Sequence, residues 1–237
     1  MSRPRQPEVR SLRALIFDFD HTLTDLGRWV NWKGARDEVM SLYRAQGLDP
    51  EQVTRRTYAF GLFAALDDAL ATHTSRPHAD GIRTQALAAL DRYEHAGAER
   101  TEWLRGAREL LDLAAGRGVA LGIVSANGEA PIRAALARLG AEDRFAAVLG
   151  RSTVFPPKPA PDMHREVLRR LGTDAASTIA VGDSPNDMRA AHGADILTIG
   201  VLGGEGTQER LLEAGATWVL EDLTVLPALL HFWSELS

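Results

Sequence analysis

The sequence has no cysteine and no long apolar run, and only 6% of its residues are aromatic. The lack of cysteine in a chain of 237 residues excludes a disulfide, a thiolate metal site and a cysteine nucleophile. No apolar run approaches the roughly 20 residues that a membrane helix needs, so we expect no membrane contact. The first residues are charged and interrupted by proline, unlike a signal peptide. We therefore expect a cytoplasmic protein.

An excess of basic charge is also missing. The chain has 27 Lys and Arg against 32 Asp and Glu, a formal net charge of −5. A broad basic face for nucleic acid is therefore not expected. With 45% hydrophobic and 25% charged residues, the composition is that of a globular protein and excludes disorder. The length suits one large domain, or a core domain with a smaller insert. Nothing in the sequence indicates the oligomeric state.

Short apolar runs alternate with amphipathic segments along most of the chain. The clearest predicted strands are 15–20, 120–125 and 178–183, and weaker ones are 146–149, 196–200 and 217–220. Helical spacing of apolar residues predicts helices at 104–116, 132–139, 163–171, 188–192 and 209–214. Strands that alternate with helices in this way predict an α/β fold with a doubly wound, mostly parallel, Rossmann-like sheet.

The segment between the first strand and the rest of this pattern differs in composition. It is rich in Ala, Leu, Arg and Glu, and helices are predicted at 29–46, 51–71 and 81–95. We interpret it as an inserted all-helical domain. The boundaries are then 12–26 and 100–237 for the α/β core and 27–99 for the insert. A helical stretch that simply packs into the main body is the alternative.

The first acidic motif follows the first predicted strand. Asp18 and Asp20 stand two residues apart, and a strand would place both carboxylates on one side. Two close carboxylates repel each other unless a cation lies between them, and Mg²⁺ is the usual cation beside phosphate. A helix cap or a solvated turn would explain the same residues without any chemistry.

A second acidic motif, Gly182–Asp187, follows another buried strand and opens a helix. Helix capping would explain one acidic residue here, but the motif contains two, Asp183 and Asp187. In an open α/β sheet the carboxyl ends of the strands share one crevice. This topology can therefore bring Asp183 close to Asp18 and Asp20.

Two further polar residues stand at informative positions. Lys158 lies between prolines that keep it out of a helix, although a lone lysine is most often a solvated surface residue. Ser125 ends the second predicted strand, and its alternative role is to cap the helix that begins near Pro131.

The four motifs in this order resemble those of the haloacid dehalogenase-like (HAD) hydrolase superfamily. They are Asp18-Phe-Asp20-His-Thr22, a strand ending in Ser125, Lys158-Pro-Ala-Pro-Asp162, and Gly182-Asp-Ser-Pro-Asn-Asp187. The last two are similar to the phosphoglycolate phosphatase-like branch. The resemblance covers the α/β core, and the helical insert resembles the cap domain of that branch by position and helicity.

This resemblance implies a Mg²⁺-dependent phosphatase that acts on a small phosphorylated metabolite through an aspartyl-phosphate. Asp18 is then the nucleophile and Asp20 the general acid and base. The resemblance further implies that Mg²⁺ is held by Asp18, the Asp20 carbonyl and Asp183. Asp187 would act on the metal through water or a hydrogen bond. Ser125 and Lys158 bind the phosphoryl group in such enzymes, and Thr22 supports the site.

The sequence departs from the usual pattern at two positions and leaves other functions open. His21 stands where glycine is frequent, and Ala126 separates Ser125 from Asn127. A phosphomutase of the same superfamily, or a non-catalytic binding or regulatory module, remains an alternative. The glycine-rich segment 200–206 lacks the spacing of a nucleotide-binding loop and is expected to be a mobile loop near the mouth of the site.

Overall fold

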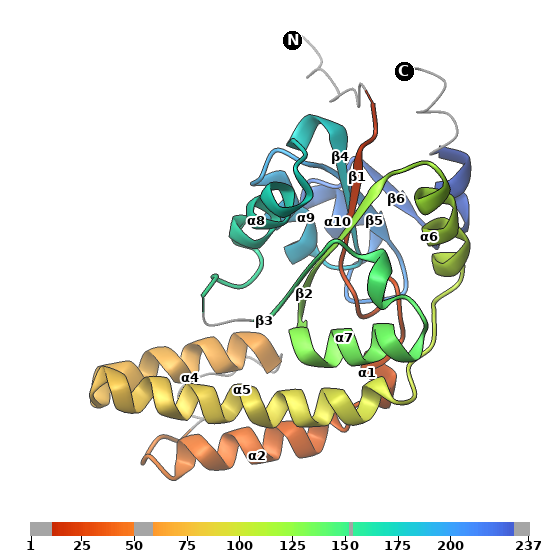
Figure 1. The fold of residues 1–237 in the computed structure, drawn as a ribbon. Coiled ribbons are helices and arrows are strands. Elements are labelled where there is room, and N and C mark those ends of the chain that lie inside the picture. Colours follow the sequence, from red (N-terminus) through yellow and green to blue (C-terminus); the bar gives the residue numbers. More distant parts are fainter. Residues whose placement is uncertain (1–10, 50–58, 152–153, 230–237) are drawn as a thin grey trace, which may run out of the picture.

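The computed structural model describes residues 11–49, 59–151 and 154–229, which form a parallel sheet with helices on both faces and a helical block at one end (Figure 1). The sheet has the strand order β3-β2-β1-β4-β5-β6, and every pairing is parallel. The strands are β1 (Ala14–Phe17), β2 (Ala120–Gly128), β3 (Ala147–Arg151), β4 (Thr178–Gly182), β5 (Leu197–Val201) and β6 (Trp218–Leu220). The predicted α/β fold with a parallel sheet is confirmed.

The strands coincide with continuous apolar runs in the sequence, because helices cover both faces of the sheet. All residues of β1 are buried, and successive ones face opposite sides. Leu15 and Phe17 belong to the larger core cluster, whereas Ile16 belongs to a second cluster. A strand with two buried faces reads as a continuous apolar run rather than as an alternating one.

The helices of the α/β part divide between the two faces of the sheet. They are α6 (Ala107–Gly116), α7 (Glu129–Arg138), α8 (Asp162–Leu171), α9 (Pro185–His192) and α10 (Gln208–Glu213). Three short 3₁₀ helices complete this part: η1 (Glu142–Arg144), η2 (Ala175–Ser177) and η3 (Leu223–Val225). Helices α6 and α7 pack in the cluster of Leu15 and Phe17, and α8 and α9 in that of Ile16. The sheet is therefore doubly wound, as predicted.

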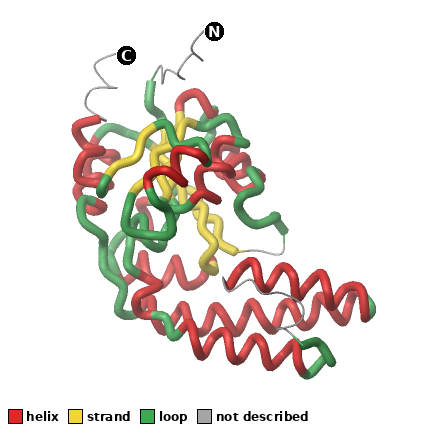
Figure 2. Tube along the Cα trace, turned by 180° about the vertical axis from the view of Figure 1, so that it is seen from behind, coloured by secondary structure: helices red, strands yellow, loops and turns green. Residues whose placement is uncertain are grey.

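The helical block comprises α1 (Leu26–Trp29), α2 (Trp32–Arg44), α4 (Ala59–His73) and α5 (Arg76–Ala98). In Figures 1 and 2 it lies beyond the carboxyl ends of the strands, which point toward it. It has a core of its own, which includes Val39, Leu66 and Leu90. The helix predicted for 29–46 is divided, because Val30 is extended and Asn31 caps α2 by accepting a hydrogen bond from Gly34 N. Residues 51–58 of another predicted helix lie outside the described residues.

The block is connected to the α/β part at both of its ends. Asp25, before α1, accepts hydrogen bonds from Glu102 N (2.8 Å) and Thr101 Oγ1 (3.3 Å), which follow α5. One carboxylate therefore ties the two connecting segments together. The C-terminal part of α5 also packs against α7 and β2. None of the helices in the described part of the chain is long and apolar enough to cross a membrane.

Candidate active site

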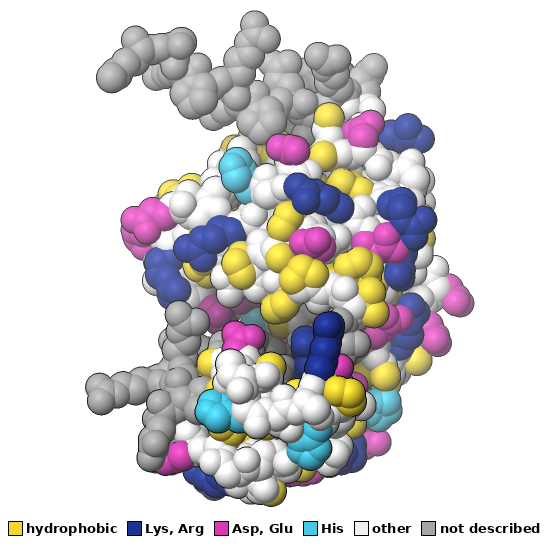
Figure 3. Space-filling model, turned by 90° about the vertical axis from the view of Figure 1, so that its left-hand side faces the viewer, with side chains coloured by type: hydrophobic (Ala, Val, Ile, Leu, Met, Phe, Trp, Pro, Cys, Tyr) yellow, Lys and Arg dark blue, Asp and Glu magenta, His cyan; other side chains and the backbone are white. Residues whose placement is uncertain are grey.

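Three neighbouring strands carry the residues that the sequence singled out. Strands β2, β1 and β4 are adjacent and parallel, so their carboxyl ends meet at the edge that faces the helical block. Asp18 directly follows β1, Ser125 lies in β2, and Asp183 directly follows β4. Figure 3 shows the molecule hollowed between its sheet-bearing part and the helical block, with charged side chains at the rim. Such a crevice is where open α/β sheets bind ligands.

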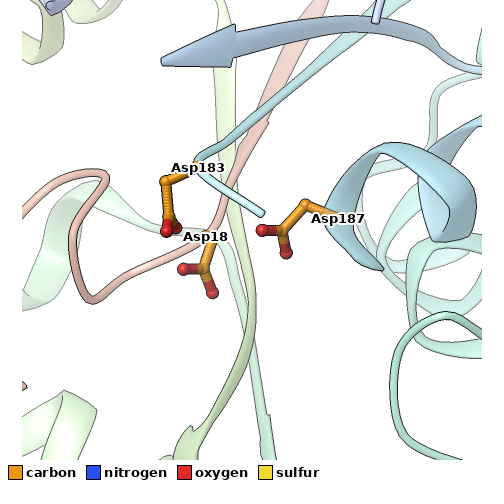
Figure 4. Close-up of side chains that lie close together, drawn as sticks. All are labelled: Asp18, Asp183 and Asp187. Atoms are coloured by element: carbon orange, nitrogen blue, oxygen red, sulfur yellow. The ribbon is translucent and has the colours of Figure 1, made fainter. Parts of the chain in front are cut away.

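Asp18, Asp183 and Asp187 form a compact carboxylate cluster. Each offers one oxygen, and these oxygens lie within 4.8 Å of one another. The three residues are 9%, 3% and 4% exposed, and Figure 4 shows their carboxylates converging from β1, from the loop after β4 and from the start of α9. The sequence prediction that Asp18 and Asp183 meet is therefore confirmed in space.

Lys158 reaches into this cluster from the proline-rich segment. Its Nζ donates a hydrogen bond to Asp18 Oδ1 (2.8 Å), another to Asp187, and a third to the Val124 carbonyl (3.2 Å). Its side chain is only 6% exposed, so the alternative of a solvated surface lysine is wrong. Burial opposes its charge, but attraction by the two carboxylates raises the pKa of Lys158 above its ordinary value.

The three carboxylates carry more negative charge than one lysine offsets. Burial, followed by repulsion from Asp187 and Asp18, raises the pKa of Asp183 to about 8. Burial likewise raises the pKa of Asp18, against the attraction of Lys158. Burial also disfavours the charge on Asp187, but Lys158 outweighs it and lowers the pKa of that carboxyl. A buried set of oxygen donors with surplus negative charge fits a hard divalent cation such as Mg²⁺.

The Asp183 carboxylate is held in a fixed orientation from two sides. Its Oδ1 accepts a hydrogen bond from Thr22 Oγ1 (3.2 Å), and its Oδ2 accepts one from Glu205 N (3.0 Å). The carbonyl of Asp183 accepts a third from Gly206 N (2.9 Å). Thr22, to which the resemblance gives a supporting role, thus lies beside Asp183. The glycine-rich loop lies against the same residue, a contact that the sequence did not indicate.

The carboxylate of Asp20 lies apart from the three clustered acids. Its Oδ1 accepts a hydrogen bond from Gly27 N (2.7 Å), at the start of the helical block. Burial raises the pKa of Asp20 to about 6, with attraction by His21 as the main opposing effect. His21 Nε2 lies 3.8 Å from Asp20 Oδ2, and its side chain is 46% exposed. Asp20 therefore has a protonation range that suits proton transfer near neutral pH.

Asp187 also fulfils the helix-capping interpretation of its motif. Ser184 is the N-cap of α9; its Oγ accepts from Asp187 N while the Asp187 carboxylate accepts from Ser184 N (3.0 Å). This reciprocal pair is a capping box. The same carboxylate faces Lys158 through its other oxygen. Capping and membership of the cluster are thus compatible, because a carboxylate has two oxygens.

Ser125 is buried and does not cap α7, which begins at Glu129 with Gly128 as its N-cap. Its Oγ donates to Asn127 Oδ1 (3.1 Å) and accepts from Asn127 N (3.3 Å). Asn127 therefore stays close to Ser125 although Ala126 separates the two. The sequence had left the role of Asn127 open, and this contact makes it part of the strand end that carries Ser125.

Several residues of this region carry no signal in the sequence. Glu94 and Arg151, from α5 and β3, bind the strand end that contains Asn127. His164, on α8, is 4% exposed, and burial with repulsion from Lys158 lowers its pKa to about 3. Glu94 and Arg151 are far in sequence from the strand end that they bind. Only tertiary contacts could reveal them.

Comparison with known proteins agrees with this geometry. The family described as haloacid dehalogenase-like hydrolase matches residues 15–201. The phosphoglycolate phosphatase of Rhodospirillum rubrum is 32% identical over 235 residues, which cover 93% of this chain and 91% of that protein. The CbbY protein of Cupriavidus necator is 34% identical over 155 residues, or 61% of this chain and 60% of that protein. The chain belongs to the haloacid dehalogenase-like hydrolase family. Within it, the chain falls in the phosphoglycolate phosphatase-like branch, as its motifs predicted.

Solved structures share the fold. CbbY from Rhodobacter sphaeroides, crystallised with phosphate, superposes with a TM-score of 0.66 at 22% identity over 91% of this chain and 96% of that one. A hydrolase from Pseudomonas syringae superposes with a TM-score of 0.67 at 23% identity, covering 92% of this chain and 97% of that one. The similarity extends over nearly the whole length of each chain, and it therefore includes the helical block.

Proposed function

We propose that this protein is a Mg²⁺-dependent phosphatase that hydrolyses a small phosphorylated metabolite through an aspartyl-phosphate on Asp18. The observation that carries the proposal is the position of the Asp18 carboxylate. It lies 2.8 Å from the Lys158 ammonium and within 4.8 Å of the Asp183 and Asp187 oxygens, at the carboxyl edge of the sheet. Phosphoryl transfer needs a positioned nucleophile surrounded by groups that stabilise phosphoryl oxygens, and this arrangement supplies them.

The chemical steps follow from the surroundings of the two motif acids. Asp18 attacks phosphorus, and the bond from phosphorus to the leaving oxygen breaks as Asp20 donates a proton to that oxygen. Asp20 then takes a proton from the water that attacks the aspartyl-phosphate, which releases inorganic phosphate and restores Asp18. Lys158 and Ser125 bind phosphoryl oxygens. The pKa of about 6 for Asp20 supports both of its roles, because each protonation state is accessible near neutral pH.

Asp18, Asp183 and the backbone carbonyl of Asp20 are the groups that would hold Mg²⁺, with Asp187 acting through water or through Lys158. When bound, the cation supplies positive charge that neutralises the phosphoryl oxygens. The support is the surplus negative charge of a buried, all-oxygen donor set. Thr22 and Glu205 N hold the Asp183 carboxylate in place for this task.

Metal removal tests this part directly. EDTA should abolish turnover of p-nitrophenyl phosphate, Mg²⁺ should restore it, and Ca²⁺ should not, because Ca²⁺ is larger and takes more ligands. Full activity in excess chelator would contradict a metal-dependent mechanism.

Residues 27–99 serve, in this proposal, as a cap domain on a catalytic core of residues 12–26 and 100–237. The block lies beyond the carboxyl ends of the strands, where it can exclude water from the phosphoryl group and contact the leaving group. The relative from Rhodospirillum rubrum suggests phosphoglycolate as one substrate to test. A screen of phosphorylated metabolites with Mg²⁺, ranked by kcat/KM, identifies the substrate. Release of inorganic phosphate distinguishes hydrolysis from mutase activity, which returns an isomeric phosphate ester.

A further inference from the structure

A second buried polar network lies next to the proposed phosphate site and has Glu94 at its centre. Glu94 belongs to α5 of the helical block, yet its side chain is completely buried where α5 meets the α/β part. A buried carboxylate is costly unless it is paired and hydrogen-bonded. The hydrogen-bond donors and the positive charge around Glu94 therefore explain how its carboxylate can be buried.

Among the residues that the structure describes, all donors of hydrogen bonds to this carboxylate lie on the α/β part. Its Oε1 accepts from Asn127 Nδ2 (3.2 Å) and from the Arg151 guanidinium (2.9 Å). Its Oε2 accepts from Gly128 N (2.8 Å) and again from Arg151 (3.0 Å). An ionised carboxylate accepts at both oxygens, so it matches this set of donors, whereas an amide would place an N–H against one of them.

Arg151 compensates the negative charge of Glu94 and also binds the end of β2. Its side chain is 9% exposed and forms a two-pronged ion pair with Glu94. It also donates to the Ala126 carbonyl (3.0 Å), one residue after Ser125. Asp91, one turn before Glu94 on α5, binds the same guanidinium, but its side chain is 41% exposed.

The network determines how the strand end presents Ser125. Because Asn127 Nδ2 faces the Glu94 carboxylate, Asn127 Oδ1 faces Ser125 and accepts the hydrogen bond from its Oγ. The Gly128 N–H and the Ala126 carbonyl are bound on either side of Asn127. Three consecutive residues after Ser125 are thus fixed by Glu94 and Arg151.

We propose that Glu94, together with Arg151, is a positioning residue for phosphate binding: from the helical block it orients Asn127 and thereby the Ser125 hydroxyl that contacts the phosphoryl group. The inference rests on the proposed function, since it assigns phosphate binding to Ser125. It goes beyond that function because it makes part of the phosphate site depend on a residue of α5. The block then contributes to binding of the phosphoryl group as well as covering it.

The test compares Glu94→Gln with Asp91→Asn in the full-length protein. Glu94→Gln keeps the shape but places an amide N–H against donors, whereas Asp91→Asn weakens a second ion pair of the same arginine and leaves the hydrogen bonds from Asn127 and Gly128 to Glu94 in place. Binding of inorganic phosphate is measured by calorimetry with saturating Mg²⁺, beside thermal unfolding and steady-state turnover. Glu94→Gln should weaken phosphate binding by about tenfold and raise KM. Asp91→Asn should stay within about twofold of the parent.

The half-saturating Mg²⁺ concentration should stay the same in both variants, because neither residue contacts the carboxylate cluster. A purely structural role for Glu94 predicts a lower melting temperature with unchanged phosphate affinity, and that result would overturn the inference. Absence of phosphate binding and turnover in the parent protein would instead contradict the proposed function, so the two failures are distinguishable.

Asn127→Ala provides a second route if Glu94→Gln does not fold. This variant leaves the ion pair between Glu94 and Arg151 intact and removes the two side-chain hydrogen bonds by which Asn127 joins Glu94 to Ser125. It should also weaken phosphate binding by about tenfold at a melting temperature near that of the parent. Unchanged phosphate affinity in a folded Asn127→Ala variant would show that the orientation of Ser125 does not depend on this network.

Discussion

Asp18 and Asp20 are two residues apart in sequence, but the structure gives their carboxylates different surroundings. Asp18 lies among Lys158, Asp183 and Asp187, whereas Asp20 accepts its hydrogen bond from Gly27 N. Gly27 is needed there, because a Cβ on it would lie 2.3 Å from Asp20 Oδ2. These different surroundings are consistent with the proposed roles, in which Asp18 attacks phosphorus and Asp20 exchanges protons with the leaving group.

Substitution of each acid should separate these roles. Asp18→Asn should abolish turnover, because the amide cannot form the phospho-enzyme. Asp20→Asn should still transfer the phosphoryl group from p-nitrophenyl phosphate, whose leaving group needs no proton, but should release it slowly because the attacking water lacks a base. A rapid-quench assay with labelled substrate would then show label accumulating on Asp20→Asn. Near-normal turnover by Asp18→Asn would mean that another residue is the nucleophile.

His21 occupies a strained backbone conformation beside Asp20, with a φ of 59°. This left-handed region favours glycine, and a side chain there costs conformational energy. His21→Gly should therefore raise the free energy of unfolding by about 0.5–1 kcal/mol, as measured by urea denaturation. Because His21 attracts the Asp20 carboxylate, its removal should also shift the alkaline limb of the pH–rate profile upward. An unchanged profile would show that His21 does not act on Asp20.

At the scale of elements, the segment Gly200–Gly206 ends β5 and forms the loop after it. The sequence predicted a mobile loop near the mouth of the site. In the structure it packs directly on Asp183: a Cβ on Gly204 would lie 1.8 Å from Asp183 Oδ2, and Glu205 N donates to the same oxygen. The loop therefore helps to fix a proposed metal ligand.

Gly204→Ala should consequently weaken Mg²⁺ binding. The added methyl group must displace the Asp183 carboxylate or the loop, since they cannot both stay in place. The half-saturating Mg²⁺ concentration in the p-nitrophenyl phosphate assay should rise by about tenfold or more. Gly116→Ala, at the end of α6, is the matched control because its Cβ would meet no neighbouring atom within 4 Å. An equal effect of both substitutions would contradict a specific role for the loop.

At the scale of the whole molecule, we expect the buried acids to make stability depend on pH and on Mg²⁺. Asp20 and Asp183 have pKa values of about 6 and about 8, against 3.8 for an ordinary Asp. In the metal-free protein the folded state therefore keeps protons that the unfolded chain has already lost. Stability falls with rising pH wherever the folded state binds more protons, so it should decrease from about pH 4 to about pH 8.

At the proposed site Mg²⁺ would displace the proton of Asp183, so it should stabilise the protein more at about pH 8 than at about pH 5. The measurement is the rise in melting temperature on adding Mg²⁺ at each pH. Asp183→Asn should lose most of the metal effect, and its metal-free stability should vary less with pH. A Mg²⁺ effect that is larger at the lower pH would contradict this assignment of the raised pKa values.

Local sequence patterns predict the helices of the helical block but not the contacts of the block with the α/β part. Its helical content follows from composition and periodicity, and it has its own core around Val39 and Leu90. The sequence predicted an inserted domain at 27–99. However, α5 packs against α7 and β2, and Glu94 is buried at that contact. A deletion of the block would therefore remove the Glu94 carboxylate that binds Asn127 and Gly128 at the end of β2.

The sequence by itself predicted the parallel α/β fold and singled out Asp18, Lys158 and Asp183 as candidate site residues. The fold follows from short-range patterns, the apolar runs that end in acid, whereas Lys158 was singled out by its place in the order of the four motifs. Adjacent parallel strands then bring such residues together whatever the details of packing.

Only the tertiary structure decided which residues orient this site. Glu94 accepts a hydrogen bond from Gly128 N, Gly204 packs against the Asp183 carboxylate, and Gly27 N donates a hydrogen bond to Asp20. The local sequence around Glu94 is that of an alanine-rich helix, and it would look the same if the glutamate side chain faced solvent. Its burial depends on where α5 lies relative to β2, and contacts between such distant segments leave no periodicity in the sequence.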